Sequence, residues 1–243
     1  MKFHCFFEQS GTFKNEFKKL GYQAYDYDIL NDFNETDYVI DLFDEIEKAY
    51  LELSSIFDKL KNGEDTILAF FPCIRFEEQI QMHYRGTTFQ QKNWSIESKL
   101  QYNLKLHKEL SNLYDLITKL VIVCIRKNIP LIIENPYSKN HYLVKYWSIP
   151  YTILDTDRTI RGDYYKKPTQ YWFINCKPKN NFIFEPLELV ERKKITALKK
   201  NGGVNDTVER SLIHPQYANR FIREFIIDEK NDKNNWNVLK NML

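Results

Sequence analysis

The sequence predicts an α/β fold built on a doubly wound, mostly parallel sheet of the Rossmann-like kind. Short apolar runs, such as 67–71 and 131–133, stop at a proline or an acidic residue, which is typical of buried parallel strands. Segments with apolar residues at helical spacing separate these runs. The 243 residues are 43% hydrophobic and 15% aromatic, which is enough to bury a substantial core in one large domain. Strands that alternate with helices over short connections favour a sheet covered on both faces.

Strands and helices are expected to alternate along most of the chain. The expected strands are 2–7, 22–27, 38–42, 67–71, 131–134, 151–154 and 171–176. The expected helices are 13–20, 44–60, 94–127 and 215–227, with a further helix after Pro136. The helix over 94–127 carries leucines at regular spacing, so we expect it to be buried along much of its length.

Three regions are expected. Residues 1–176 form the main α/β domain. Residues 177–209 are rich in Lys, Asn and Pro and include a Gly-Gly pair, which predicts a small, partly irregular appendage that serves as a recognition or mobile region. Residues 210–243 hold the last helix and a polar tail, and we expect them to pack back on the main domain.

Composition excludes several classes of protein. The net charge of +2 does not indicate a nucleic-acid binder, so a polyanionic partner would be held by a local patch. No apolar run approaches the roughly 20 residues that span a bilayer, which predicts a soluble, intracellular protein without a membrane partner. The four cysteines lack C-x-x-C spacing, so we expect neither a metal site nor disulfides, and we expect Cys5, Cys124 and Cys176 to be inert core residues.

Two neighbouring strands end in residues with catalytic chemistry. Cys73 follows the run 67–71, and Glu134 follows the run 131–133. The carboxyl ends of parallel strands share one edge of a sheet, where open α/β folds bind ligands, so we expect the two side chains to meet there. A thiol that attacks and a carboxyl that handles a proton are what covalent catalysis on a ring substrate needs.

The setting of Cys73 admits two interpretations. It is either a nucleophile or a buried, small, apolar side chain. A nearby Arg75 or Arg85 would favour the thiolate. Glu77 and Glu78 would instead raise the pKa of the thiol if they face it.

Three other segments are candidates for a nucleotide-type site. The run FFEQSGTF at 6–13 leads from a strand through a small-residue turn into a helix, and it is either an ordinary turn or one that turns backbone N–H groups toward a ligand. Asp28 ends the second strand, where an acid accepts hydrogen bonds from ribose hydroxyls; it is alternatively a solvated loop carboxylate, and Asp26 competes for the role. Asp41 lies in the apolar run YVIDLF and needs a partner, either an adenine amino group or a helix N-terminus.

Taken together, these motifs resemble those of DNA cytosine-5 methyltransferases, in particular a short, phage-type member. The motifs are, in chain order, FEQSGTF at 7–13, Asp28, Asp41, FPC at 71–73, ENP at 134–136, RGDYYKKPTQYWFINC at 161–176 and RSLIHP at 210–215. The resemblance covers residues 1–176 and 210–227. It rests on the order and spacing of the motifs rather than on any one of them.

The resemblance implies S-adenosylmethionine as the cofactor and DNA as the partner, with the target cytosine swung out of the duplex. The implied cofactor-binding residues are Phe7, Ser10, Gly11, Thr12, Pro72, Asp28 on the ribose and Asp41 on the adenine. Cys73 would add to carbon 6 of the ring, and Glu134 would bind and protonate the ring nitrogen. The resemblance also implies the cytoplasm of a bacterial or phage-infected cell.

Further candidates follow for the substrate side of the site. Arg158 and Arg161 are candidates for a basic catalytic residue near the base. Candidate substrate contacts are Arg75, Arg85, Asn135, Lys167 and Thr169; candidate phosphate contacts are Lys193, Lys194, Lys199 and Lys200, which alternatively lie on a solvated helix face. Gly86 is the expected hinge of a mobile catalytic loop. Two other functions stay open: a catalytically weakened binding or regulatory protein, and an enzyme that acts on RNA or free nucleotides.

Overall fold

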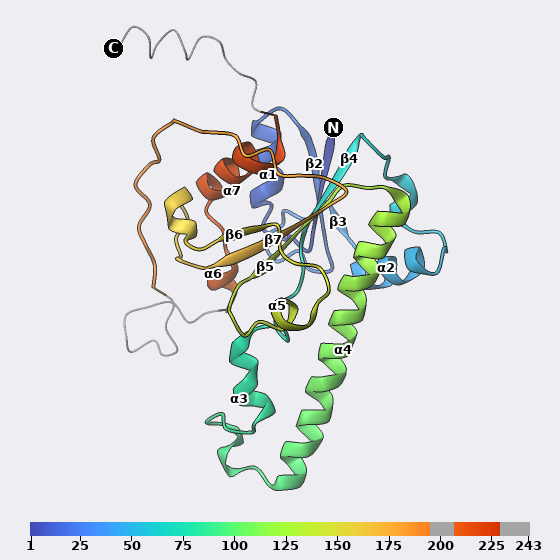
Figure 1. Ribbon diagram of the computed structural model, residues 1–243, viewed down its shortest axis with the longest axis vertical. Coiled ribbons are helices and arrows are strands. Elements are labelled where there is room, and N and C mark those ends of the chain that lie inside the picture. The colour runs from blue at the N-terminus through green and yellow to red at the C-terminus, as the bar shows by residue number, and fades with distance from the viewer. Residues whose placement is uncertain (195–206, 229–243) are drawn as a thin grey trace, which may run out of the picture.

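The computed structural model describes residues 1–194 and 207–228, which contain a seven-stranded sheet with the order β3-β2-β1-β4-β5-β7-β6 (Figure 1). The strands are β1 (Lys2–Phe6), β2 (Gln23–Asp28), β3 (Tyr38–Val39), β4 (Asp65–Phe70), β5 (Leu131–Pro136), β6 (Ile153–Asp155) and β7 (Thr169–Ile174). The pairs formed by β1 to β5 are parallel, whereas β7 runs antiparallel to both β5 and β6. The predicted α/β class with a mostly parallel, doubly wound sheet is confirmed.

Helices cover both faces of the sheet. They are α1 (Thr12–Lys19), α2 (Leu42–Tyr50), α3 (Gln81–Tyr84), α4 (Ile96–Lys127), α5 (Tyr142–Tyr146), α6 (Thr207–Ser211) and α7 (Pro215–Phe221), which continues into a π-helical turn at Ile222–Ile226. In Figure 1, α1 and α7 lie on one side of the sheet, and α2 and α4 lie on the other. None of the helices in the described ranges is long and apolar enough to cross a membrane.

Each covered face of the sheet has its own hydrophobic cluster. On one face, strand residues such as Ile67 and Ile133 pack against Ile46 of α2 and Leu120 of α4. On the other face, a second cluster contains buried residues of β1, α1, β7 and α7, including Phe3, Phe13, Phe17, Tyr171 and Phe221. The central strands β4 and β5 are therefore buried on both faces, as the apolar runs at 67–71 and 131–133 predict.

The long helix departs from the expectation that most of it is buried. Leu113 and Leu120, in its second half, are buried against the sheet, but Leu100 and Leu104 are 61% and 72% exposed. The first half projects beyond the sheet with α3 beside it (Figure 1), and the Asn103 amide donates to the Tyr84 carbonyl. Leucine spacing defines one face of a helix, but it does not tell whether another element covers that face.

Two element boundaries also differ from the predictions. The third strand ends at Val39 rather than at residue 42, because Asp41 forms the N-cap of α2 and accepts a hydrogen bond from Phe43 N. The helix expected over 44–60 ends at Tyr50, and a separate 3₁₀ turn follows at Ile56–Lys59.

The segment 177–194 forms neither helix nor strand and lies along the C-terminal helical segment. Backbone hydrogen bonds join Lys179 N to Phe225 O and Asn181 N to Glu224 O. Arg223 also pairs with Glu185. The described part of the expected appendage is thus fastened to the C-terminal helical segment; Lys199 and Lys200 lie outside the described residues.

Candidate active site

Cys73 lies just beyond the carboxyl end of β4, in the turn that Phe71 and Pro72 begin. Its Sγ is 3.1 Å from Oε1 of Glu77, so the thiol donates a hydrogen bond to that carboxylate. Burial raises the pKa of the Cys73 thiol, and the negative charge of Glu77 raises it further. Glu78 instead accepts a hydrogen bond from the Asn140 amide, so Glu77 is the acid that faces the thiol.

Glu134 lies on β5, directly beside Phe70 of β4 in the parallel register. Its carboxyl group is buried, and burial raises the pKa of Glu134, although the positive charges of Lys167 and Arg158 oppose the shift. A raised pKa favours the protonated carboxyl, which is the form that can donate a proton.

The side chain of Asn135 joins the two strand ends. It is fully buried, and its Nδ2 donates to the carbonyl oxygen of Phe71 at 2.7 Å. Asn135 therefore holds the Cys73 turn against β5 and is not among the residues that line the cavity described below; its role as a substrate contact stays a prediction.

Arg158 lies in the 3₁₀ turn Arg158–Arg161 and is buried beside Glu134. It forms an ion pair with Asp163, and its Nη1 is 4.0 Å from Oε1 of Glu134. Its guanidinium carbon is 4.6 Å from the centre of the Tyr217 ring, a cation–π contact. Arg158 is thus a fixed positive charge next to the carboxyl group.

One cavity of about 270 Å³ brings Cys73, Glu134 and Arg158 together. Its other lining residues include Phe7, Ser10, Asp28, Pro72 and Lys167. It lies outside the carboxyl ends of β1 and β4, where the strand order reverses and where doubly wound sheets bind ligands. We call it the catalytic cavity.

A second cavity of about 350 Å³ adjoins the first, because Phe7, Asp28, Phe70 and Pro72 line both. Its remaining walls are largely apolar, with Asp41 beside them: Ile29, Leu30, Leu42 and Phe43. Apolar walls with a few carboxylates suit a flat heterocycle joined to a sugar. We call it the cofactor slot.

The two acids of β2 have different surroundings. Asp28, at the end of the strand, lines both cavities, and its Oδ1 accepts a hydrogen bond from Leu30 N at 2.8 Å. Asp26 is fully buried and pairs with Lys14 at 3.0 Å, so it cannot reach a ligand in either cavity. Asp41 caps α2, which is the second of its two predicted alternatives, yet it also lines the cofactor slot.

In the turn after β1, the Glu8 side chain already accepts hydrogen bonds from backbone N–H groups that could otherwise face a ligand. The Glu8 carboxylate accepts a hydrogen bond from Phe13 N at 2.8 Å, and Lys14 N also points at it, so the first turn of α1 is already capped. Gly11 has φ of 66°, and a Cβ there would lie 2.8 Å from Oε2 of Glu35. Ser10 reaches the catalytic cavity, whereas Thr12, which begins α1, bonds to the Ser10 hydroxyl.

Three further candidate residues do not line the catalytic cavity: Arg161, Thr169 and Arg75. Arg161 pairs with Asp155 and Glu224 at 3.1 and 2.7 Å, because its turn directs it toward the C-terminal helix. Thr169 is fully buried, and its hydroxyl donates to the Lys167 carbonyl.

Arg75 is also engaged elsewhere, since its Nε donates to Glu109 of α4 at 2.6 Å. It is therefore directed toward the arm of α3 and α4 and does not bond to the thiol. Gly86 has φ of 64°, in the left-handed region, and follows the short helix α3.

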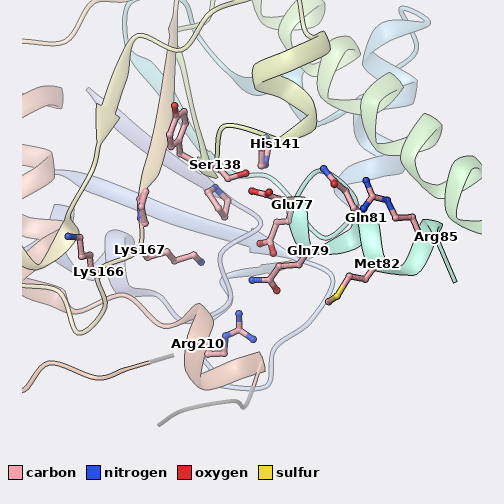
Figure 2. Close-up of a pocket in the computed structure, with 14 residues that line it drawn as sticks. Glu77, Gln79, Gln81, Met82, Arg85, Ser138, His141, Lys166, Lys167 and Arg210 are labelled. Atoms are coloured by element: carbon pink, nitrogen blue, oxygen red, sulfur yellow. The ribbon is translucent and has the colours of Figure 1, made fainter. Parts of the chain in front are cut away.

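Arg85 and Lys167 line a third cavity, of about 480 Å³, next to the catalytic cavity (Figure 2). Lys193, a candidate phosphate contact, pairs with Glu209 at 2.9 Å, and Lys194 is exposed.

Sequence reasoning missed several residues of the site. Ser211, Leu212 and Ile213 line the catalytic cavity from the far end of the chain. The motif RSLIHP at 210–215 contained them, but it carried no sign of where it packs. Arg210, which lines the third cavity, begins that same motif, whereas His141, which also lines it, had no signal beyond its residue type.

Comparison with protein-family models and with curated sequences does not identify a function, so any functional proposal rests on the geometry of the site. No protein-family model matches the chain, and no curated protein sequence matches it.

Proposed function

We propose that this protein transfers a methyl group from S-adenosylmethionine to carbon 5 of a cytosine in DNA, through a covalent adduct with Cys73. The observation that carries the proposal is the catalytic cavity, which contains a thiol and a buried carboxyl group from neighbouring strands. The adjoining cofactor slot, at the edge where Rossmann-like sheets bind nucleotides, supports it.

The residues of the cofactor slot fit the implied cofactor. The ring of Phe43 and the aliphatic chains of Ile29 and Leu30 suit the adenine, and Asp28 is placed for ribose hydroxyls. Phe7 and Pro72 line both cavities and would contact the part of the cofactor nearest Cys73. When bound, S-adenosylmethionine supplies an electrophilic methyl group.

The first chemical task is to ionise Cys73. Because burial and Glu77 both raise the pKa of the thiol, few molecules carry a free thiolate at neutral pH. Glu77, at 3.1 Å, is placed to take the thiol proton as the sulfur attacks carbon 6 of cytosine. The transfer leaves Glu77 neutral, so no pair of like charges forms beside the ring.

The second task is to activate carbon 5. As the carbon–sulfur bond forms, Glu134 donates its proton to the ring nitrogen, and carbon 5 becomes an enamine-like nucleophile. Arg158 then stabilises the Glu134 carboxylate. After methylation, loss of the carbon 5 proton to water expels the sulfur; Cys73 recovers its proton from Glu77, and Glu134 recovers its proton from the ring nitrogen.

A second candidate function is a protein that binds the cofactor and nucleic acid without methyl transfer. The observation in its favour is the raised pKa of the thiol. The two candidates differ in covalent chemistry and share cofactor binding.

Two measurements test the proposal. S-adenosylmethionine at about 100 times its Kd should stabilise the protein by about 2.7 kcal/mol in a thermal-shift assay, and no stabilisation would count against both candidates. Incubation with S-adenosylmethionine and DNA that contains 5-fluorocytosine should then trap a covalent complex, because fluorine cannot leave as the proton does. Cofactor binding without an adduct would favour the second candidate, and an adduct with Cys73→Ser would contradict the role of the thiol.

A further inference from the structure

The third cavity, of about 480 Å³, opens beside the catalytic cavity but is a separate feature of the surface. Pro136 and Lys167 line both cavities. Glu77, whose carboxylate accepts the Cys73 hydrogen bond, also lines the third cavity. A group bound in this cavity would therefore sit directly next to the nucleophile.

Positive charge surrounds this cavity, which we call the basic cavity. Figure 2 shows Lys166 and Lys167 on one side, Arg85 on another and Arg210 below. Lys166 pairs with Asp157 at 3.6 Å. Over residues 1–194 and 207–228, no ion pair is formed by the side chains of Arg85, Lys167 or Arg210.

The acidic side chains of the basic cavity are already engaged. Glu77 accepts the thiol hydrogen bond, and Glu78 accepts a hydrogen bond from Asn140 at 2.6 Å. These neutral partners leave both carboxylates charged, but four basic side chains line the cavity against these two acids, so its net charge is positive, which favours an anion.

A buried histidine adds a neutral donor to the cavity wall. His141 is only 1% exposed, and its Nδ1 lies 3.2 Å from Nε2 of Gln170. That amide nitrogen also donates to the Pro136 carbonyl, so the amide is the donor and Nδ1 the acceptor. The hydrogen of the imidazole is then on Nε2, and burial keeps the ring neutral by lowering the pKa of His141 to about 4.

Neither Nε2 of His141 nor the hydroxyl of Ser138 has a hydrogen-bond partner within the described ranges, although both atoms are buried. Leaving a buried polar group unpaired costs free energy, so two such groups on one cavity wall indicate a site whose ligand supplies the hydrogen-bond acceptor. Both residues line the basic cavity, and Figure 2 shows them on the same side of it as Glu77.

We propose that the basic cavity binds the phosphate group of the cytosine nucleotide and so directs its base into the catalytic cavity. Arginine side chains and neutral N–H and O–H donors together match the several acceptor oxygens of a phosphate. The volume is of the size that small-ligand sites have, and it accommodates a sugar with its phosphate. The proposal deepens the proposed function and rests on it only for the identity of the base.

Binding measurements without S-adenosylmethionine test the phosphate site apart from methyl transfer. Calorimetric titration compares the full chain with deoxycytidine, with deoxycytidine monophosphate and with single-stranded DNA that carries one cytosine. Arg85→Gln and Arg210→Gln should each weaken binding of the phosphate-bearing ligands by about tenfold or more. Lys61→Gln, an exposed lysine that precedes β4 at the opposite edge of the sheet, is the charge-matched control and should change nothing.

The ligands also distinguish the two sources of phosphate. Tighter binding of the monophosphate than of the nucleoside indicates a free nucleotide, whereas binding of the DNA alone indicates a phosphodiester in a polymer; either result supports the site. Equal affinity for nucleoside and nucleotide, with DNA binding that Arg85→Gln and Arg210→Gln leave at the level of Lys61→Gln, overturns the proposal. Trapping of a covalent adduct together with that result would overturn the phosphate site and leave methyl transfer intact.

Discussion

The substitution Glu77→Gln gives the sharpest test of the proposed chemistry, because Glu77 has two effects on Cys73 that act in opposite directions. As a negative charge it makes the thiolate harder to form. As a proton acceptor at 3.1 Å it gives the thiol proton a destination during attack. Glutamine keeps the size of the side chain and a hydrogen-bond acceptor but removes both the charge and the basicity.

The magnitudes can be worked from the geometry. Two unit charges at 3.1 Å repel by about 5 kcal/mol at an effective dielectric constant of about 20, and this repulsion adds to burial, which is the larger cause of the raised pKa of the Cys73 thiol. Removing this repulsion should speed alkylation of Cys73 by iodoacetamide, since that reagent reacts with the thiolate. Removing the proton acceptor should lower kcat for methyl transfer by about 10² to 10⁴.

The assay therefore compares two rates in the same variant. Glu77→Gln is expected to alkylate faster and to methylate more slowly than the wild-type chain; Glu97→Gln, which alters an exposed acid in the first turn of α4, should change neither rate. Methyl transfer that is equal or faster in Glu77→Gln would refute the role as proton acceptor and leave Glu77 as a repulsive neighbour. A fall in both rates would indicate damage to the turn.

Three further predictions concern stability, each measured by urea unfolding. Burial raises the pKa of Glu8 to about 7, so the folded chain binds a proton on the Glu8 carboxyl group more tightly than the unfolded chain does. This proton stabilises the folded chain by about 3 kcal/mol at most. The stabilisation is full in acid and is lost as the pH rises through about 7. Glu8→Gln should remove this loss, because an amide oxygen can still accept from Phe13 N, and a variant with the wild-type pH profile would contradict the assignment. Asn135→Ala should cost about 1–3 kcal/mol, since it removes a fully buried hydrogen bond between two strand ends, and a change near zero would show that the link is dispensable. Arg158→Met should cost about 3–5 kcal/mol, because it leaves Asp163 buried without its cation; a variant as stable as the wild-type chain would contradict the structural role of this ion pair.

The parts of the fold that local sequence determines were predictable. The runs 67–71 and 131–133, which gave β4 and β5, are apolar at successive positions and stop at Pro72 and Glu134, so both strands could be recognised. The projecting half of α4 could not, because the pattern of Leu100 and Leu104 is the same whether a neighbour covers them or not. The end of β3 was missed for a related reason: a capping aspartate and a buried one look alike within an apolar run.

The candidate site divides in the same way. Cys73 and Glu134 could be placed together because neighbouring parallel strands carry their ends to one edge of the sheet. The orientation of Glu77 toward the thiol depends on the turn at 73–76. The position of Ile213 in the wall of the catalytic cavity depends on packing between segments far apart in the sequence. Neither property is encoded in the spacing of residues.

The position of α7 affects how the chain folds while it is being synthesised on the ribosome. Tyr171 stacks on Phe221 with ring centres 4.1 Å apart, and the Tyr217 hydroxyl donates to Asp155, so a late helix seals one side of strands made much earlier. Until that helix leaves the exit tunnel, the aromatic residues that pack against it, among them Tyr171, lack this contact. The nascent chain is most prone to aggregation at this stage, so chaperones that bind exposed apolar surfaces during translation should raise the yield of folded protein.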